Sequence, residues 1–330
     1  MGTSRVAALG LIVLLGGVTD FTLTLTSVSP GVAQEQGLTI ERGMSFTDIA
    51  SLLDTRGLIR SARAFSIYAV MNGVAHQLKP GQYAVRPSVS TPTIVRQLVA
   101  GPVDISVTIP EGTSLVDVER LLAARGLLGS GDLTLLSPEL FVDDFPFLAG
   151  AASLEGFLFP DTYRIAPGSS PRAIARTFLH GFREKALPLA VEPGGALDYG
   201  LLTTASLLER EVRSATDRRL VAGIIAERLV LGMALQVDAT VMYAVCGGSF
   251  EACGGLTEDD FAVESEFNTY VFAGLPPSPI ANPGVAALEA ARTPLESAYL
   301  FYLSDPATGT TVFSETFEEH NEHRARYLQR

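Results

Sequence analysis

Two stretches of the 330-residue sequence set carboxylates among apolar neighbours. The first contains Glu155 and Asp161, and the second contains Glu209 and Glu211. Burial beside apolar groups raises the pKa of a carboxyl group, and a carboxyl with a raised pKa suits general acid catalysis near neutral pH. The sequence therefore offers candidates for acid/base chemistry in both stretches.

Helical spacing does not choose between Glu209 and Glu211. At about 100° per residue, one apolar stripe runs along their predicted helix. The stripe consists of Leu201, Ala205, Leu208 and Val212. The two glutamates lie on opposite flanks of it, so either could reach a cleft. A simpler alternative is that both pair with Arg210 or Arg213 at the edge of the core.

Other catalytic and metal-binding signatures are absent from the sequence. It contains no phosphate-binding loop, no H-E-x-x-H zinc motif and no G-x-S-x-G nucleophile motif. His320 and His323 form an isolated i, i+3 pair on a charged C-terminal segment, which favours solvated surface over a metal site. Cys246 and Cys253 are the only cysteines. In an oxidising compartment they would form a local disulfide rather than a zinc site.

Composition excludes some classes of partner. Hydrophobic residues make up 47% and charged residues 18% of the chain, which is typical of a globular protein. The formal net charge of −12 would repel a phosphate backbone, so nucleic acid is not expected as a partner. A neutral or mixed-charge polysaccharide meets no such objection. Because the chain has no tryptophan, Tyr and Phe would have to stack on any sugar.

The N-terminal residues 1–36 predict export. Arg5 precedes the apolar run Val6–Val18, which resembles the core of a signal peptide and is short for a spanning helix. One alternative is cleavage after Ala33, which would release a soluble exported protein. The other is an uncleaved segment that continues to Val28 and serves as a membrane anchor.

An internal repeat predicts the organisation of the next part of the chain. Residues 38–49 align with residues 107–118, and the match extends through a later Arg-Gly-Leu without a gap. A strand, a turn at glycine and a helix capped by serine follow in each copy. This β-α-α-β plan resembles the LysM module, and either glycan binding or simple packing would account for it. We expect an α+β fold with a LysM-like module over 37–105 and a larger mixed α/β catalytic domain over 106–330. That domain would begin with the second LysM-like repeat, 106–165.

The downstream segments must position the carboxylates. Asp198 predicts the start of a helix that runs to about Arg213, and Ser214 or Thr216 predicts the start of another that ends at Gly232. Several prolines in residues 256–284 predict an extended loop. A short helix, a pair of strands at 299–303 and 310–313, and a final helix to the C-terminus complete the prediction.

Several long motifs of this downstream part resemble one family. They are Ser206–Val212, Val221–Leu229, Gly232–Tyr243, Phe267–Pro277, Ile280–Gly284, Val312–Glu315 and Glu319–Asn321. In this order they resemble the YceG-like (MltG) family of endolytic murein transglycosylases, and the resemblance runs from about residue 38 to the end. It implies a lytic transglycosylase that acts on nascent peptidoglycan and leaves a 1,6-anhydro-N-acetylmuramic acid end. It implies no cofactor.

The resemblance selects Glu211 as the single catalytic acid/base, because this residue matches the second Glu of the family's E-K-E-T motif. Arg210 and Val212 replace the Lys and Thr of that motif, and Val237 and Ala239 replace the Thr and Pro of Q-T-D-P-T. None of these replacements removes a titratable carboxyl. They leave the predicted reaction intact and bear on the finer substrate contacts.

Further residues are predicted to bind the substrate. These residues are Glu155, Asp161, Gln236, Asp238, Thr240, Asn268, Thr269, Tyr270 and Asn282. Alternatives stay open for several of them: Asn268 could form a turn, Asp238 could cap the next helix, and Asn282 could hold a loop. Asp161, beside a proline, could likewise hold a loop.

The resemblance also implies a location and partners. It implies a single-pass anchor in the inner membrane with the catalytic domain on the periplasmic side, and it suggests peptidoglycan synthases as partners. Two rival functions remain open. One is a peptidoglycan hydrolase, or muramidase, that uses Asp238, Glu155 or Asp161 as a second carboxylate. The other is a non-catalytic glycan-binding protein of the cell wall.

Overall fold

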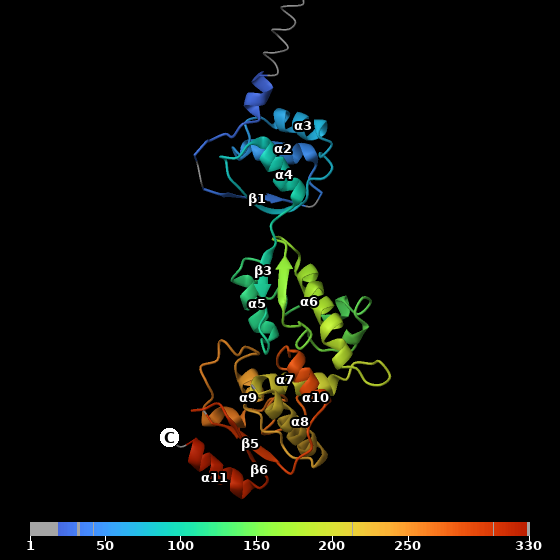
Figure 1. Ribbon diagram of the computed structural model, residues 1–330, viewed down its shortest axis with the longest axis vertical. Coiled ribbons are helices and arrows are strands. Elements are labelled where there is room, and N and C mark those ends of the chain that lie inside the picture. Colours follow the sequence, from blue (N-terminus) through green and yellow to red (C-terminus); the bar gives the residue numbers. More distant parts are fainter. Residues whose placement is uncertain (1–18, 32–33, 42, 213, 306, 329–330) are drawn as a thin grey trace, which may run out of the picture. The chain divides into compact units, whose positions relative to one another are not determined.

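The structure, a computed structural model, describes residues 19–31, 34–41, 43–212, 214–305 and 307–328. The chain is a mixture of helices and short two-stranded sheets, which confirms the predicted α+β class (Figure 1). It divides into two compact units. The first comprises residues up to 105 together with 164–169, and the second comprises 106–163 and 170–330.

The core of the first unit is built from two strands and three helices. They are β1 (Gln36–Ile40), α2 (Phe46–Thr55), α3 (Ala62–Met71), β2 (Gly81–Val85) and α4 (Thr91–Ala100). The strands β1 and β2 pair antiparallel, with Leu38 opposite Tyr83. Alternation along each strand buries one face of the sheet against the helices. Ser45 caps α2 as predicted, because its hydroxyl accepts the Asp48 amide at 3.2 Å.

The second unit begins with the other copy of the repeat. It contains α5 (Leu115–Ala123), most of β3 (Ile105–Thr108) and the first half of β4 (Thr162–Ile165), and β3 pairs with β4. Where the first copy has its second α-helix, this copy has turns and two short 3-10 helices, η1 (Pro138–Leu140) and η2 (Pro146–Leu148). The Glu119 carboxylate accepts the backbone amides of Gly131, Leu133 and Thr134, which holds this segment as a loop. The two copies therefore differ in their second half.

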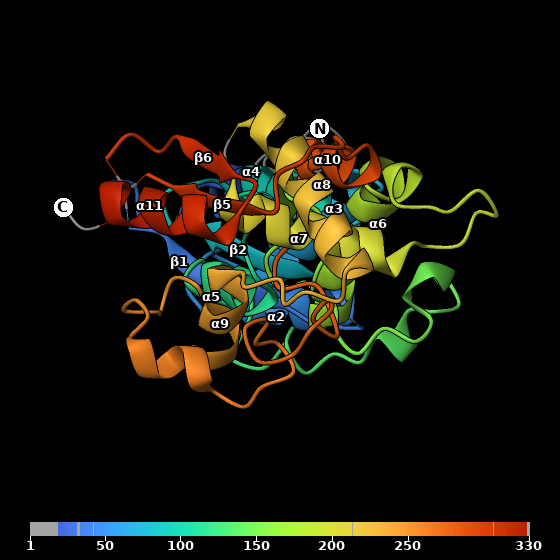
Figure 2. The same cartoon turned by 90° about the horizontal axis from the view of Figure 1, so that it is seen from below.

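Helices dominate the remainder of the second unit. They are α6 (Pro171–Lys185), η3 (Leu187–Leu189), α7 (Tyr199–Glu211), α8 (Ala215–Val230), α9 (Asp238–Val245), η4 (Glu258–Ala262), α10 (Val285–Arg292) and α11 (Phe317–Tyr327). Helix α10 packs against α7 and α8, and the antiparallel strands β5 (Phe301–Ser304) and β6 (Thr311–Ser314) lie beside α11 in both views (Figures 1 and 2). Asp198 and Ser214 cap α7 and α8, which confirms both predicted helix starts.

The predicted N-terminal segment falls mostly beyond what the structure describes. The apolar run Val6–Val18, Val32 and the proposed cleavage residue Ala33 all lie outside the described residues. Within the described part of the chain, no helix has both the length and the apolar character needed to cross a membrane.

Candidate active site

A pocket of about 620 Å³ opens in the second unit, lined by parts of α7, α8, α9, η4, β5 and α11. Four residues predicted from the sequence line it together: Glu211, Gln236, Asp238 and Tyr270. Segments that are separated by more than 100 residues along the chain meet here. The fold therefore assembles one site from the two helices that carry the main motifs and from the C-terminal strand and helix.

Glu211 is the last residue of α7, and its carboxyl faces this pocket. Its Oε1 lies 3.4 Å from the backbone amide of Ala239, and its Oε2 lies 3.4 Å from the hydroxyl of Tyr302. Burial, together with the neighbouring charge of Asp238, raises the pKa of Glu211 to about 7. The two donors and Arg210 act in the opposite direction. A carboxyl with this pKa can both give and take a proton at neutral pH.

Glu209 lies outside the pocket, and its carboxylate binds other groups of the protein. Its carboxylate pairs with Arg218 at 2.9 Å and accepts the backbone amide of Gly284 at 2.8 Å. Arg218 also donates to the carbonyl of Val212, just beyond the end of α7. Of the two glutamates between which helical spacing could not choose, only Glu211 lines the pocket.

Asp238 is the first residue of α9, and its carboxylate forms a hydrogen bond with a tyrosine. Its Oδ1 accepts the hydroxyl of Tyr270 at 2.5 Å, and the Tyr270 ring packs edge-on against Phe261 of η4 at 4.8 Å. Because Phe261 and Tyr270 both line the pocket, this contact builds one wall of the site.

The backbone just before α9 is unusual. Gln236 has a φ of 53°, which makes it the one non-glycine residue with positive φ among the residues described. Its amide donates to the carbonyl of Thr269 at 3.0 Å, and the next amide, that of Val237, donates to the Thr269 hydroxyl. Non-glycine residues in this conformation cost free energy and concentrate at functional sites.

Thr240 and Thr269 lie beneath this segment rather than in the pocket. Both are buried, and their hydroxyl groups are 2.9 Å apart. Thr240 also donates to the carbonyl of Val237 at 2.7 Å. The two threonines therefore fix the backbone that presents Gln236 and Asp238.

Asn268 and Asn282 are both fully buried and hold loops. The Asn268 amide donates to the carbonyls of Phe261 and Val263, at the end of η4. The Asn282 side chain accepts the amide of Leu158 and donates to the carbonyl of Thr113, both at 2.8 Å. Neither asparagine lines the pocket.

Glu155 and Asp161 also lie away from the pocket. The buried Glu155 carboxyl accepts the Leu115 amide, at the start of α5, and the Tyr243 hydroxyl. Burial raises the pKa of Glu155 to about 8. Asp161 pairs with Lys185, and this hydrogen bond lowers the pKa of the Asp161 carboxyl. The other carboxylates that line the pocket with Glu211 are Asp238 and Glu258.

Sequence reasoning missed the residues that β5 and α11 bring to the pocket: Phe301, Tyr302, His320 and Arg324, together with Arg228 of α8. The prediction of His320 as solvated surface is wrong. Its ring is half-buried, stacks on Phe301 at 5.4 Å and lines the pocket. The family motif Glu319–Asn321 could have indicated that His320 has a role in the site. The charged helix around it gave no such indication.

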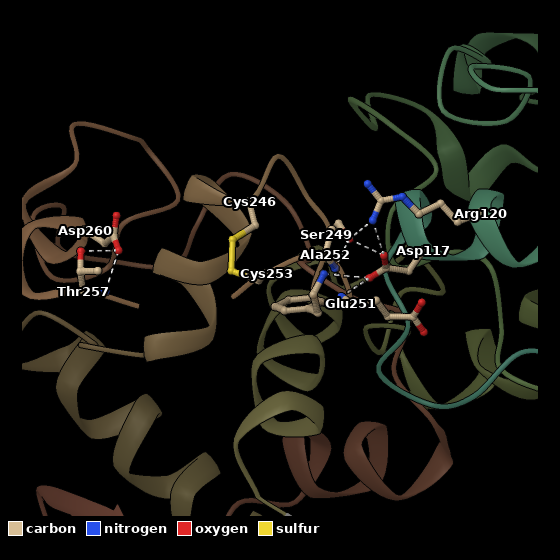
Figure 3. Close-up of a disulfide and its surroundings, with 10 residues drawn as sticks. Asp117, Arg120, Cys246, Ser249, Glu251, Ala252, Cys253, Thr257 and Asp260 are labelled. Atoms are coloured by element: carbon tan, nitrogen blue, oxygen red, sulfur yellow. Dashed lines mark hydrogen bonds and ion pairs between the residues drawn. A yellow bond between two sulfur atoms is a disulfide. The ribbon is translucent and has the colours of Figure 1, made fainter. Parts of the chain in front are cut away.

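The cysteines lie just before η4 in the chain, outside the lining of the pocket. A disulfide joins Cys246 and Cys253. The loop between them binds Asp117 of α5, which accepts the Ser249 hydroxyl at 2.5 Å and the Phe250 amide at 2.8 Å (Figure 3). The chain then continues to η4, which begins with a capping box between Thr257 and Asp260 and carries two residues of the pocket. The disulfide loop, which precedes η4 in the chain, is thus bound to α5.

Comparison with known proteins points to one family. The sequence profile of the YceG-like family matches residues 38–326. A Bacillus subtilis protein named endolytic murein transglycosylase is 29% identical, over 88% of this chain and 84% of that protein. A Streptococcus pneumoniae protein of the same name is 27% identical over 95% of this chain, which spans only 62% of that protein.

A solved structure agrees with these relatives. The crystal structure of a YceG-like protein from Listeria monocytogenes superposes with a TM-score of 0.57 at 30% identity. The match covers 88% of this chain and 99% of that one. The similarity thus extends over both compact units and includes every residue placed in the pocket except Leu328.

Proposed function

The chain belongs to the YceG-like family, and from this premise we propose that it is an endolytic murein transglycosylase. Its substrate would be the glycan strand of peptidoglycan, cut between N-acetylmuramic acid and N-acetylglucosamine. Glu211 would be its only acid/base. The relatives named endolytic murein transglycosylase support the reaction class, and the pocket supports the residue.

One observation carries the assignment of Glu211: a carboxyl with a pKa of about 7 lines a pocket large enough for sugar rings. An ordinary exposed glutamate is almost wholly ionised at pH 7 and could not serve as the acid. Burial provides the protonated form, while the Ala239 amide and the Tyr302 hydroxyl stabilise the carboxylate left after proton transfer. Both forms are thus available within one catalytic cycle.

The reaction needs two proton transfers through this carboxyl. Protonated Glu211 gives its proton to the glycosidic oxygen as the bond from that oxygen to the muramic C1 breaks. The resulting carboxylate takes the proton of the muramic 6-hydroxyl, whose oxygen bonds to C1 and closes the 1,6-anhydro ring. Because the nucleophile belongs to the same sugar, proximity favours attack and no water has to be positioned.

Hydrolysis is the rival reaction, and Asp238 is the observation that favours it. Asp238 lies in the same pocket as Glu211 and could activate a water molecule or attack C1. Its carboxylate already accepts the Tyr270 hydroxyl, which supports a structural role instead. Mass analysis of the products separates the two reactions, because a hydrolytic product is heavier by one water molecule than an anhydro end.

The test is Glu211→Gln on purified peptidoglycan. We expect the loss of anhydro-ended products by at least about 100-fold, because the amide cannot transfer a proton. Glu209→Gln is the matched control two residues earlier. It should lower stability, since Arg218 loses its charged partner, yet the folded protein should still cleave. Full activity of the Glu211→Gln variant would refute the assignment.

The remaining parts of the chain receive roles that follow from the same reaction. We assign residues 1–36 to export or anchoring, residues 37–105 to a LysM-like module that binds glycan, and residues 106–330 to the catalytic domain. The second domain would begin with its own LysM-like repeat, 106–165. A substrate in the cell wall requires an extracytoplasmic catalytic domain, in keeping with a single-pass inner-membrane protein. Peptidoglycan synthases would supply the nascent strands.

A further inference from the structure

The pocket carries positive charge on the side formed by α8, β5 and α11. Arg228, His320 and Arg324 line it there, around the ring of Phe301. The acidic residues of the same pocket are the acid/base Glu211, its neighbour Asp238, and Glu258 of η4. The proposed reaction uses the carboxyl and needs none of the three basic side chains, so their presence requires another explanation.

Arg228 is a buried cation that forms no ion pair with any carboxylate in the described part of the chain. Its side chain is held by carbonyl oxygens: Nε donates to Leu300 at 2.7 Å, and Nη1 donates to Ala234 and Leu235 at 3.1 and 2.8 Å. The residue is 5% exposed, and among the residues described no carboxylate lies within 4.0 Å of its guanidinium nitrogens. Burying an arginine is costly unless a negative charge balances it. Among the described residues no carboxylate therefore pairs directly with Arg228, although Glu211, Asp238 and Glu258 line the same pocket.

Arg228 and His320 both contact the aromatic ring of Phe301. The Arg228 guanidinium lies 5.1 Å from the centre of the Phe301 ring, and the His320 ring stacks on Phe301 at 5.4 Å. His320 Nδ1 is buried and has no hydrogen-bond partner among the residues described. A buried polar atom of this kind usually marks a missing ligand or water.

Arg324 lies one helical turn beyond His320 on α11. It is exposed, lines the pocket, and makes no ion pair with any residue that the structure describes. Two guanidinium groups and an imidazole therefore converge on the pocket, and none of the three has an acidic partner in the described chain. Arginine is well suited to carboxylate recognition because its planar fork can donate two parallel hydrogen bonds.

We propose that Arg228, His320 and Arg324 bind a carboxylate of the glycan substrate, so that the pocket selects strands by negative charge as well as by sugar. This inference rests on the proposed function. Two sources share this chemistry: the lactyl carboxylate of a muramic residue without a peptide, and the carboxylates of a peptide stem. Binding such a group would pair directly with Arg228 and would hold the muramic sugar in the pocket with Glu211.

The test compares strands that differ only in charge. Peptide-bearing strands are cleaved before and after their carboxylates are converted to neutral methylamides, and kcat/KM is measured for each. We expect the wild-type protein to prefer the charged strand by about tenfold, because charge-assisted hydrogen bonds are lost on blocking. Arg324→Gln should reduce this preference to about twofold or less, while Arg324→Lys should retain most of it.

Arg326→Gln is the matched control. It removes one positive charge from the exposed face of the same helix at a residue outside the pocket, so it should keep the wild-type preference. If Arg326→Gln and Arg324→Gln lower the preference equally, net charge rather than the pocket is responsible, and the inference fails.

Stem-free strands, which carry only lactyl carboxylates, distinguish the two sources. A preference for these strands over their own methylamides assigns the site to the lactyl group. A preference seen only with peptide-bearing strands assigns it to the stem. Equal cleavage of charged and blocked strands by the wild-type protein overturns the inference and leaves the proposed function standing. No cleavage of any strand overturns the proposed function itself.

Discussion

The carboxyl of Glu211 and the hydroxyl of Tyr302 lie 3.4 Å apart, although 91 residues separate them along the chain. Tyr302 comes from β5, and Glu211 ends α7. The hydroxyl lowers the pKa of Glu211, whereas burial and Asp238 raise it. The C-terminal strand thus helps to set the protonation state of a residue placed by a helix far earlier in the sequence.

Tyr302→Phe should shift the pH dependence of cleavage. The reaction needs protonated Glu211, so kcat/KM falls as pH rises through a pKa of about 7. The lost hydrogen bond favoured the carboxylate, so its removal raises the pKa of Glu211. The alkaline limb of the profile should move upward by roughly half a pH unit or more. Tyr299→Phe, which removes a hydroxyl outside the pocket, should leave the limb unchanged, and a downward movement in Tyr302→Phe would contradict the prediction.

The local structure around the site was largely predictable from the sequence. Asp198 and Ser214 cap α7 and α8 because short polar side chains satisfy the free amides of a first turn. The strand that ends the predicted β-α-α-β plan likewise corresponds to β2. Helices α4 and α6 fall outside the predictions, although a proline lies two positions after Ser90 and directly after Ser170. Both starts could have been found from a serine with a proline in the first turn after it.

The composition of the pocket could not be predicted in the same way. Nothing in local spacing tells which residues 60 or more positions away will face Glu211. The family motifs also mix two kinds of polar residue. Asn282 and Thr269 hold loops, whereas Gln236 lines the pocket, and all three need specific polar atoms. Sequence resemblance therefore identifies residues in and around the site. It does not distinguish the residues that line the pocket from those that hold the surrounding loops.

Glu155→Gln should flatten the dependence of stability on pH. The folded-state pKa of Glu155 is about 8, well above the value of an unfolded glutamate. Between these two values the folded protein holds a proton that the unfolded chain has released, so stability falls as pH rises. From pH 6 to pH 8 the variant should lose about 2 kcal/mol less than the wild-type protein in the free energy of unfolding. Urea denaturation at the two pH values measures the difference.

Glu119→Gln provides the opposite control. Hydrogen bonds from the loop after α5 lower the pKa of Glu119, so its contribution to stability is lost only as pH falls through that lowered value. This variant should be less stable throughout the range from pH 6 to pH 8 but should show the same slope as the wild-type protein. An unchanged slope in Glu155→Gln would show that Glu155 is ionised in the folded state.

Loss of the disulfide should weaken both stability and substrate binding. The bond closes a short loop between Cys246 and Cys253, and its absence should cost about 2 kcal/mol in the free energy of unfolding. The same loop holds Asp117 and leads to η4, so the double variant Cys246→Ser/Cys253→Ser should also raise KM. Thermal denaturation with and without reductant checks this. Reductant should destabilise the wild-type protein alone, and equal melting temperatures in all four samples would contradict the prediction.

Gln236→Gly should weaken substrate binding and increase the free energy of unfolding. Gln236 holds a φ of 53°, a conformation that costs a side-chain-bearing residue about 1 kcal/mol and costs glycine nothing. The backbone bond to Thr269 does not need the side chain, so the variant should keep the fold and gain up to about 1 kcal/mol in the free energy of unfolding. Its KM should rise, because the pocket loses an amide. Gln236→Ala separates the two effects: it should raise KM similarly without the gain in stability. A Gln236→Gly variant that unfolds more easily than Gln236→Ala would show that the strain is not relieved at this position.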